Sequence, residues 1–277
     1  MKYFYVIANL DKDYAAETKD AILDYLTRRG ASCTVQPSLP GDGGHVDRQS
    51  VPDNIQCVIT IGGDGTFIRA ARELAGRNIP MVGVNRGYLG FLNQVSRRED
   101  MAPVLDALLE DRYQVEERMM LMGRVFHRGK LLMEDVALNE IALTRESLLK
   151  ALRFQVSVNG EFLSRYAADG ILASTPTGST AYNLSAGGPV VAPGARMIIL
   201  TPICSHQMNA RSIVLEHTDE IRLDLLSSGQ VVAFDGDTYA RLDEGDSIWI
   251  KRSPLCTRMI KLKQISFMQN LSNHLMS

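Results

Sequence analysis

The chain has few cysteines, no long apolar run and almost no excess of charge, and each shortage excludes a class of protein. Its 277 residues include four cysteines, at Cys33, Cys57, Cys204 and Cys256, and no two of them form a Cys-x-x-Cys pair. This spacing argues against a zinc site and a disulfide framework, and it favours reduced thiols in a cytoplasmic protein. The five histidines form no metal-ligand spacing either, so we expect no resident metal site.

The absence of long apolar runs and the small net charge argue against a membrane or a nucleic acid as a binding partner. No stretch is long and apolar enough to span a bilayer, so we expect no membrane partner. The formal net charge of -2 gives no reason to expect nucleic acid or an anionic membrane surface. A hydrophobic content of 45% is ordinary for a folded protein, and the length allows two modest domains or one large one.

The first third of the chain alternates buried strands with amphipathic helices. Apolar runs predict strands at 3–8, 57–61 and 79–84, and helical spacing predicts helices at 14–26 and 66–75. A strand, a helix and a second strand of these lengths form a right-handed βαβ unit in a parallel sheet. We therefore expect an α/β N-terminal domain, with a parallel sheet and flanking helices.

The pattern changes after about residue 117, where short alternating runs separated by turn signals begin. These runs lie at 122–127, 131–144, 154–158, 170–174, 221–225, 231–234 and 247–251. They predict a β-rich C-terminal domain over 117–252, which makes the fold α+β overall. The N-terminal domain would cover 1–116. The tail, 253–277, has Phe267 and Leu271 at helical spacing and is expected to return to the first domain.

A glycine-rich turn with the sequence GGDGT, at residues 62–66, joins a predicted strand to a predicted helix. Backbone N–H groups of such a turn can point at one spot, and the helix N-terminus adds partial positive charge, so a diphosphate would fit. Asp64 would repel phosphate, but it makes sense if it orients a sugar hydroxyl or accepts its proton. The alternative is a tight turn in which Asp64 only caps the helix. No Gly-Lys-Ser/Thr follows, so this is not a Walker A loop.

Two shorter polar segments follow or interrupt apolar runs. Residues 85–92 come after the strand at 79–84, at the carboxyl end where open α/β sheets bind ligands. There Phe91 could pack beside a base, although a linker with a buried phenylalanine is the favoured alternative. Asn139 and Glu140 interrupt the run at 131–144, which is costly if they are buried without partners. Asn matches an adenine edge and Glu accepts from ribose hydroxyls, but a strand end or bulge whose side chains meet water is equally consistent.

The longest motif covers residues 169–189 and reads DGILASTPTGSTAYNLSAGGP. It predicts a strand, a loop of small hydroxyl residues, a short helix and a Gly-Gly-Pro turn. Small residues allow a flat ligand to approach closely, and hydroxyl and backbone groups supply neutral hydrogen bonds. Asp169, at the start of the strand, could hold a ribose or a carboxamide. A Ser/Thr-rich surface loop is the less favoured alternative.

Together, in this order, the four motifs resemble those of the NAD kinases, in their compact bacterial form. GGDGT alone is shared with diacylglycerol, sphingosine and phosphofructokinase relatives, but the other three are much more specific. The resemblance implies transfer of the terminal phosphoryl group of ATP, or of polyphosphate, to the 2′-hydroxyl of the adenosine ribose of NAD, giving NADP. It also implies Mg²⁺ or another divalent cation with ATP, a β-rich domain that binds NAD, and self-association to a dimer or tetramer.

The resemblance also implies roles for individual residues. Asp64 would be the base or orienting group for the 2′-hydroxyl, with Gly63, Gly65 and Thr66 on the phosphates and Phe91 beside the nucleotide. The residues that it places around NAD are Asn139, Glu140, Asp169, Ser174, Thr177, Thr180, Ala181 and Tyr182.

Two other functions stay open at this point. A lipid kinase of the diacylglycerol type should show an apolar or basic membrane-facing surface, and no such segment is visible. A non-enzymatic NAD or NADP sensor has no need for Asp64 in the turn. The sequence leaves open the phosphoryl donor, the choice between NAD and NADH, feedback by NADP, and dimer versus tetramer.

Overall fold

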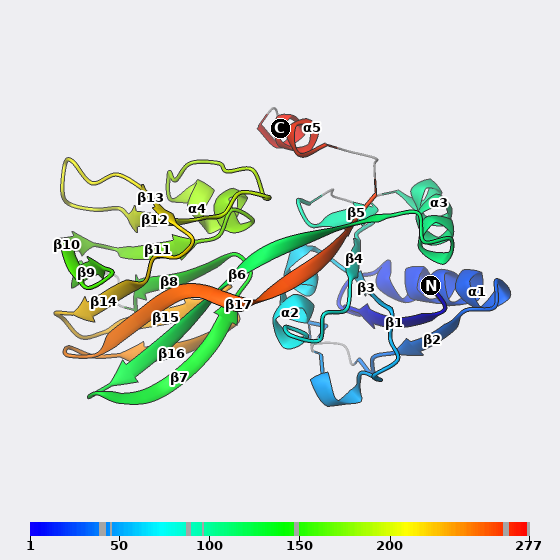
Figure 1. Ribbon diagram of the computed structural model, residues 1–277, viewed down its shortest axis with the longest axis horizontal. Coiled ribbons are helices and arrows are strands. Elements are labelled where there is room, and N and C mark those ends of the chain that lie inside the picture. Colours follow the sequence, from blue (N-terminus) through cyan, green and yellow to red (C-terminus); the bar gives the residue numbers. More distant parts are fainter. Residues whose placement is uncertain are drawn as a thin grey trace. The chain divides into compact units, whose positions relative to one another are not determined.

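The chain divides into two compact units, described here from a computed structural model (Figure 1). The structure describes residues 1–38, 43–44, 46–86, 90–95, 97–146, 150–262 and 266–275, so residues 87–89 of the segment at 85–92 lie outside the described part. Unit 1 comprises Met1–Glu117 and Thr257–Ser277, and unit 2 comprises Arg118–Cys256. The strands β6 (Gln114–His127) and β17 (Ser247–Lys261) both pass from one unit into the other.

Unit 1 is an α/β unit with a parallel sheet. Its own elements are β1 (Tyr3–Ala8), α1 (Ala15–Arg28), β2 (Ser32–Val35), a 3-10 turn η1 (Arg48–Ser50), β3 (Cys57–Ile61), α2 (Asp64–Glu73), β4 (Met81–Val84), β5 (Asn93–Val95), α3 (Arg98–Leu109) and α5 (Phe267–Leu275). The strands pair in the order β2-β1-β3-β4-β5, all parallel. This confirms the expected α/β architecture, and the fully buried strand β3 shows why its sequence is a continuous apolar run.

The core of unit 1 joins this sheet to two helices. Ile22 and Leu26 of α1 and Leu105 and Leu108 of α3 are buried in one cluster with the side chains of the central strands. Patterning did not identify α3 because Pro103 lies inside it and usually ends a helix. It also missed β5, which is only three residues long.

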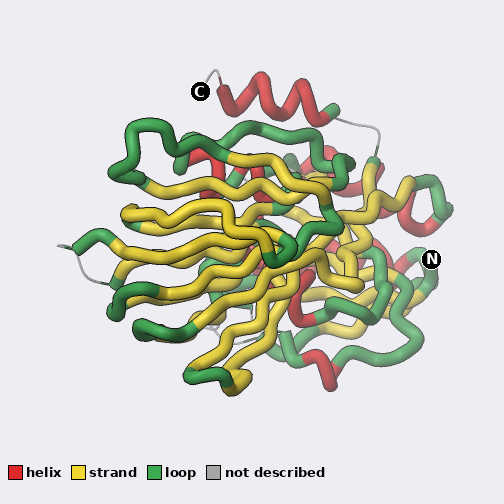
Figure 2. Tube along the Cα trace, turned by 60° about the vertical axis from the view of Figure 1, so that its left-hand side comes forward, coloured by secondary structure: helices red, strands yellow, loops and turns green. Residues whose placement is uncertain are grey.

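Unit 2 consists of two antiparallel sheets around a shared core (Figure 2). Its own elements are β7 (Lys130–Ala137), β8 (Glu140–Arg145), β9 (Leu152–Val158), β10 (Glu161–Ala168), β11 (Gly170–Ser174), a 3-10 turn η2 (Gly178–Thr180), α4 (Tyr182–Ser185), β12 (Met197–Ile203), β13 (Ile213–Glu216), β14 (Ile221–Leu225), β15 (Gln230–Phe234) and β16 (Thr238–Leu242). One sheet has the order β13-β12-β11-β8-β15-β16, and the other pairs β10-β9-β14-β17. The expected β-rich character of this half is confirmed.

One expected strand of unit 2 is in fact two. The run at 131–144 breaks between β7 and β8, so Asn139 lies in the break and Glu140 begins β8. The cause is Asp235 in the turn after β15, whose carboxylate accepts the backbone N–H groups of Leu138, Asn139 and Glu140 at 2.7, 2.8 and 3.0 Å. Both residues are 8% exposed, so the alternative is right that the pair lies at a strand end and wrong that its side chains meet water.

Candidate functional site

The glycine-rich turn joins the buried strand β3 to α2. Gly63 is the residue before the first helical turn, and Asp64 is the first helical residue, two positions earlier than expected. The N–H groups of a first helical turn have no acceptor within the helix, which suits them to an anion. A Cβ atom added to Gly63 or Gly65 would meet no atom within 4 Å, so open space lies beside the turn. Thr66 is 4% exposed, and its hydroxyl accepts Nδ2 of Asn9 at 3.4 Å.

Asp64 does not cap the helix. Gly63 holds the cap position, and the Asp64 side chain turns to the segment before β5. Its Oδ2 atom accepts the backbone N–H of Phe91 at 3.0 Å, and its Oδ1 atom accepts Nδ2 of Asn93 at 2.5 Å. The carboxylate is therefore held by donors from a second segment of unit 1, at the end of the sheet where α2 begins.

The C-terminal helix α5 contacts this same segment. The rings of Phe91 and Phe267 lie 6.3 Å apart at an angle of 49°, and Nδ2 of Asn270 donates to the carbonyl oxygen of Gly90 at 3.0 Å. Phe91 thus has a packing partner within unit 1, and its predicted place beside a nucleotide stays a prediction.

In unit 2, Glu140 is a buried acid with an unusual environment. Its Oε2 atom has no hydrogen-bond partner among the described residues. Burial raises the pKa of the Glu140 carboxyl to about 8, and the nearby charge of Asp235 adds to the rise. At pH 7 most Glu140 side chains therefore carry a proton and can donate a hydrogen bond as well as accept one.

The hydroxyl-rich loop after β11 folds back onto Asn139. The carbonyl oxygen of Asn139 accepts the backbone N–H of Thr175 at 2.8 Å and the hydroxyl of Ser174 at 3.3 Å. Gly178 lies so close that an added Cβ would be 2.3 Å from the same oxygen, so only glycine fits there. The hydroxyl of Thr177 accepts Nη1 of Arg118 at 3.4 Å. Ser174 is fully buried, and its predicted contact with NAD is not tested by this arrangement.

Hydrogen bonds between residues of the loop hold its C-terminal part in place. Asn183 is fully buried, and its amide nitrogen donates to the carbonyl oxygens of Ser179 and Pro189 at 3.2 and 3.0 Å. Thr180 is half-buried and donates to the Thr177 carbonyl oxygen at 3.3 Å. Ala181 links η2 to α4 with φ -102° and ψ -129°, which is neither a helical nor an extended conformation. These contacts fix the path of the loop that the sequence singled out.

A pocket of about 480 Å³ lies beside this loop in unit 2. It is lined by Thr144, Arg145, Asp169, Tyr182, Ser185, Ala186, Ile203 and Cys204. Tyr182 is 40% exposed, and the Asp169 carboxylate forms an ion pair with Nη2 of Arg145 at 3.0 Å. The structure therefore brings two predicted NAD-binding residues, Asp169 and Tyr182, to one pocket, and it adds a cation that sequence reasoning missed.

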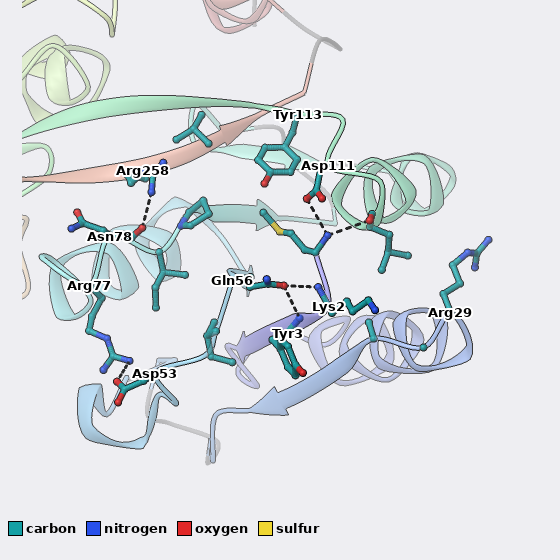
Figure 3. A pocket seen from close by; sticks show the side chains of 18 of the residues that line it. Lys2, Tyr3, Arg29, Asp53, Gln56, Arg77, Asn78, Asp111, Tyr113 and Arg258 are labelled. Carbon is teal, nitrogen blue, oxygen red and sulfur yellow. Dashed lines mark hydrogen bonds and ion pairs between the residues drawn. The ribbon is translucent and has the colours of Figure 1, made fainter.

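A groove of about 1000 Å³ lies elsewhere in unit 1 (Figure 3). Lys2, Gln56 and Pro80 line it at the amino ends of β1, β3 and β4, whereas the glycine-rich turn follows the carboxyl end of β3. Its arginines already have protein partners, since Arg77 pairs with Asp53 at 3.1 Å and Arg258 donates to a backbone carbonyl. The groove is therefore not part of the candidate site.

Within the described ranges, no His, Cys, Asp and Glu side chains form a group of three or more that could hold a metal ion. None of the helices in the described part of the chain is long and apolar enough to cross a bilayer.

Sequence reasoning missed three residues with a part in the candidate site. Asn93 holds Asp64, Arg145 holds Asp169, and Arg118 contacts Thr177. Each lies outside the four motifs or at their margin, and each partner is at least 24 positions away in the chain. Only Asn93, directly after the segment at 85–92, carried a local signal.

The comparisons with known proteins cover both units. Residues 4–113 match the ATP-NAD kinase N-terminal domain, and residues 138–262 match the ATP-NAD kinase C-terminal domain. The NAD kinase of Lachnospira eligens is 39% identical, over 99% of this chain and 99% of its own length. The NAD kinase of Agathobacter rectalis is 40% identical, over 98% of this chain and 97% of its own.

Two solved structures are similar along nearly the whole chain. The yeast NADH kinase complexed with NADH has a TM-score of 0.86 at 25% identity, covering 99% of this chain and 87% of that one. An NAD kinase from Archaeoglobus fulgidus in complex with ATP has a TM-score of 0.77 at 25% identity, covering 99% of this chain and 97% of that one.

Proposed function

The chain belongs to the ATP-NAD kinase family, and we propose that Asp64 orients the 2′-hydroxyl of the adenosine ribose of NAD and accepts its proton. The activity of the chain is the ATP-dependent phosphorylation of NAD. The comparisons give no support to a lipid kinase or a non-enzymatic sensor.

The observation that carries the proposal is the way Asp64 is held. Its carboxylate lies at the start of α2, beside the open space of the glycine-rich turn, and donors from Phe91 and Asn93 fix it there. In the reaction the 2′-oxygen forms a bond to the terminal phosphorus while the bond from that phosphorus to the bridging oxygen breaks, releasing ADP. The hydroxyl proton passes to Asp64 and then to water. Because phosphoryl transfer needs little covalent work from the protein, positioning is the main contribution.

The phosphates of the donor would lie on the first turn of α2. Gly63 and Gly65 would let them approach the backbone closely, and the helix N-terminus would attract their charge. Thr66, in the same helical turn, would also lie on the phosphates. Unit 1 is thus proposed as the phosphate-loop domain.

Unit 2 is proposed as the NAD-binding domain. The adenosine part would lie against Asn139, Glu140, Thr180 and Tyr182, and the nicotinamide half would lie toward Asp169, Ser174 and Ala181. Thr177 would also contact NAD. Two observations support this arrangement: Asp169 and Tyr182 line one pocket, and Glu140 has a buried carboxyl oxygen with no hydrogen-bond partner in the described residues.

Three further features are proposed together with this function. A divalent cation, Mg²⁺ or a similar ion, would accompany ATP, since phosphate oxygens are good ligands for it and phosphoryl transfer commonly uses one. When bound, it neutralises charge on the phosphates. We also propose a dimer or tetramer, and a cytoplasmic location that suits the four free thiols.

The test is NADP formation by the purified protein with NAD, ATP and Mg²⁺, read with a coupled NADP-specific dehydrogenase. Polyphosphate replaces ATP in a second arm. Asp64→Asn should lower turnover by on the order of 10²- to 10⁴-fold while NAD still binds in calorimetry, because an amide cannot accept the hydroxyl proton and cannot accept both hydrogen bonds that hold the carboxylate. Asp20→Asn, at an exposed acid on α1, is the matched control and should keep full turnover. Near-normal turnover by a folded Asp64→Asn protein would show that Asp64 is not the catalytic group.

A further inference from the structure

Asn93 is the side-chain donor to Asp64, and it lies at the first position of β5. It is 3% exposed, so it is shielded from solvent. Because a carboxylate only accepts hydrogen bonds, the amide must turn its NH₂ group toward Asp64, and its orientation is not ambiguous. A buried amide thus has its donor group directed at the proposed catalytic carboxylate.

A glycine on the neighbouring strand leaves the space that the Asn93 side chain occupies. Gly83 of β4 is the register partner of Asn93. A Cβ atom at Gly83 would lie 2.4 Å from Oδ1 of Asn93, so the amide occupies the space that any larger residue would fill. The strand pairing and the missing side chain together place the amide against Asp64.

The carboxylate is confined from a second direction by Gly90. A Cβ atom there would lie 2.2 Å from Oδ1 and 2.4 Å from Oδ2 of Asp64. The Asp64 carboxylate is therefore enclosed by the backbone at Gly90 and Phe91 and by the amide of Asn93.

The oxygen of the Asn93 amide, unlike its nitrogen, has no hydrogen-bond partner among the described residues. In the described part of the chain, Oδ1 of Asn93 is a buried atom with no hydrogen-bond partner. Such an arrangement costs stability, since buried polar atoms normally have partners. The amide is thus satisfied on the side of Asp64 alone.

We propose that Asn93 is a positioning residue for the phosphoryl transfer, because its amide fixes the rotation of the Asp64 carboxylate. This rests on the proposed role of Asp64. The terminal torsion of an aspartate is broad, so the orientation of its carboxylate depends on the donors around it. A second donor on the other oxygen fixes the plane, and with it the direction of the lone pairs that face the acceptor hydroxyl.

The experiment compares Asn93→Leu and Asn93→Ala, which both remove the donor while keeping or reducing the side-chain volume. The matched control is Gln94→Leu, the next amide on β5, whose Oε1 atom accepts the backbone N–H of Leu262 at 3.2 Å. Each variant is assayed for kcat and for KM of NAD and ATP, with the melting temperature as a check of folding. The two Asn93 changes are then repeated in the Asp64→Asn protein.

We expect kcat of both Asn93 variants to fall by about 10- to 100-fold with each KM within about twofold, because a misplaced catalytic group affects the reaction more than binding. In the Asp64→Asn background the same changes should lower the residual kcat no further, an outcome that general damage would not produce. Gln94→Leu should keep kcat.

Two results would overturn the inference. One is a kcat within twofold of the wild type for a folded Asn93 variant, and the other is an equal loss with and without the Asp64 carboxylate. If Asp64→Asn itself turns over normally, the proposed role of Asp64 fails and Asn93 has nothing to position. A normal Asn93→Leu protein beside an inactive Asp64→Asn protein would reject the role of Asn93 alone.

Discussion

The two units hold their key acids in opposite ways. In unit 1 both oxygens of Asp64 accept hydrogen bonds, from Phe91 and Asn93. In unit 2 one oxygen of Glu140 is buried with no partner in the described residues, and burial together with Asp235 raises the pKa of this carboxyl to about 8. Each acid lies at the start of a helix or strand, within a motif that the sequence already shows. The difference teaches that an acid's neighbours decide whether it acts as a fixed acceptor or as a group that still holds its proton.

The largest expected effect comes from closing the space around Asp64. Gly90→Ala would place a methyl group within 2.2 Å of the carboxylate, so Asp64 must move away from Phe91 and Asn93. We expect kcat to fall on the order of 100-fold in the coupled NADP assay, since a displacement of about 1 Å can have that cost. The same methyl group should also lower the melting temperature of Gly90→Ala. Adding Asp64→Ala removes the carboxylate that the methyl group meets, so the double variant should melt at a higher temperature than Gly90→Ala alone. Unchanged turnover in folded Gly90→Ala protein would contradict the enclosure of Asp64.

A smaller effect is expected where Asp235 holds the break before β8. Asp235→Ala removes the acceptor of three backbone N–H groups, so their partly buried dipoles lose their partner. We expect a loss of a few kcal/mol in stability, by analogy with other charge-assisted hydrogen bonds, and a higher KM for NAD. Asp237→Ala, at an exposed position in the same turn, is the control. Equal urea midpoints for both variants would show that Asp235 does not hold the break.

The last expected effect concerns the proton on Glu140, and it is measured on stability alone. Its pKa is raised from 4.5 to about 8 in the folded state, so folding is favoured while the group is protonated. The stability of the wild type should thus decline as the pH rises from about 4.5 to about 8 and then level off. Glu140→Gln has no such proton to lose, so its stability relative to the wild type should increase across that window. Thermal melts from pH 5 to pH 9 measure this difference, and a difference independent of pH would contradict the unusual environment of Glu140.

Much of the fold could be predicted from local patterns. The strands β3, β11 and β14 have the bounds that their apolar runs predict, because each is ended by a glycine or a turn and packs in a sheet interior. Patterns failed where tertiary contacts override them. Pro103 lies inside α3, and Asp235 splits an apolar run into β7 and β8 from about a hundred residues away.

The same division applies to the candidate site. The glycine-rich turn and the hydroxyl-rich loop could be recognised because small residues, turns and acids are visible in a single stretch of sequence. The partners of their acids could not, because Asn93 reaches Asp64 only through the pairing of β5 with β4. Arg145 likewise reaches Asp169 only because β8 lies beside β11.

By itself, then, the sequence determined the α/β and β-rich halves, the places where the chain turns, and the acids able to take part in chemistry. These depend on local geometry and on burial patterns that repeat every two or three to four residues. The tertiary structure alone decided which donors surround Asp64, why Glu140 keeps its proton, and that Asn93 belongs with the site. Hydrogen-bond partners and desolvation depend on which strands become neighbours, and strand order is a property of the folded chain as a whole.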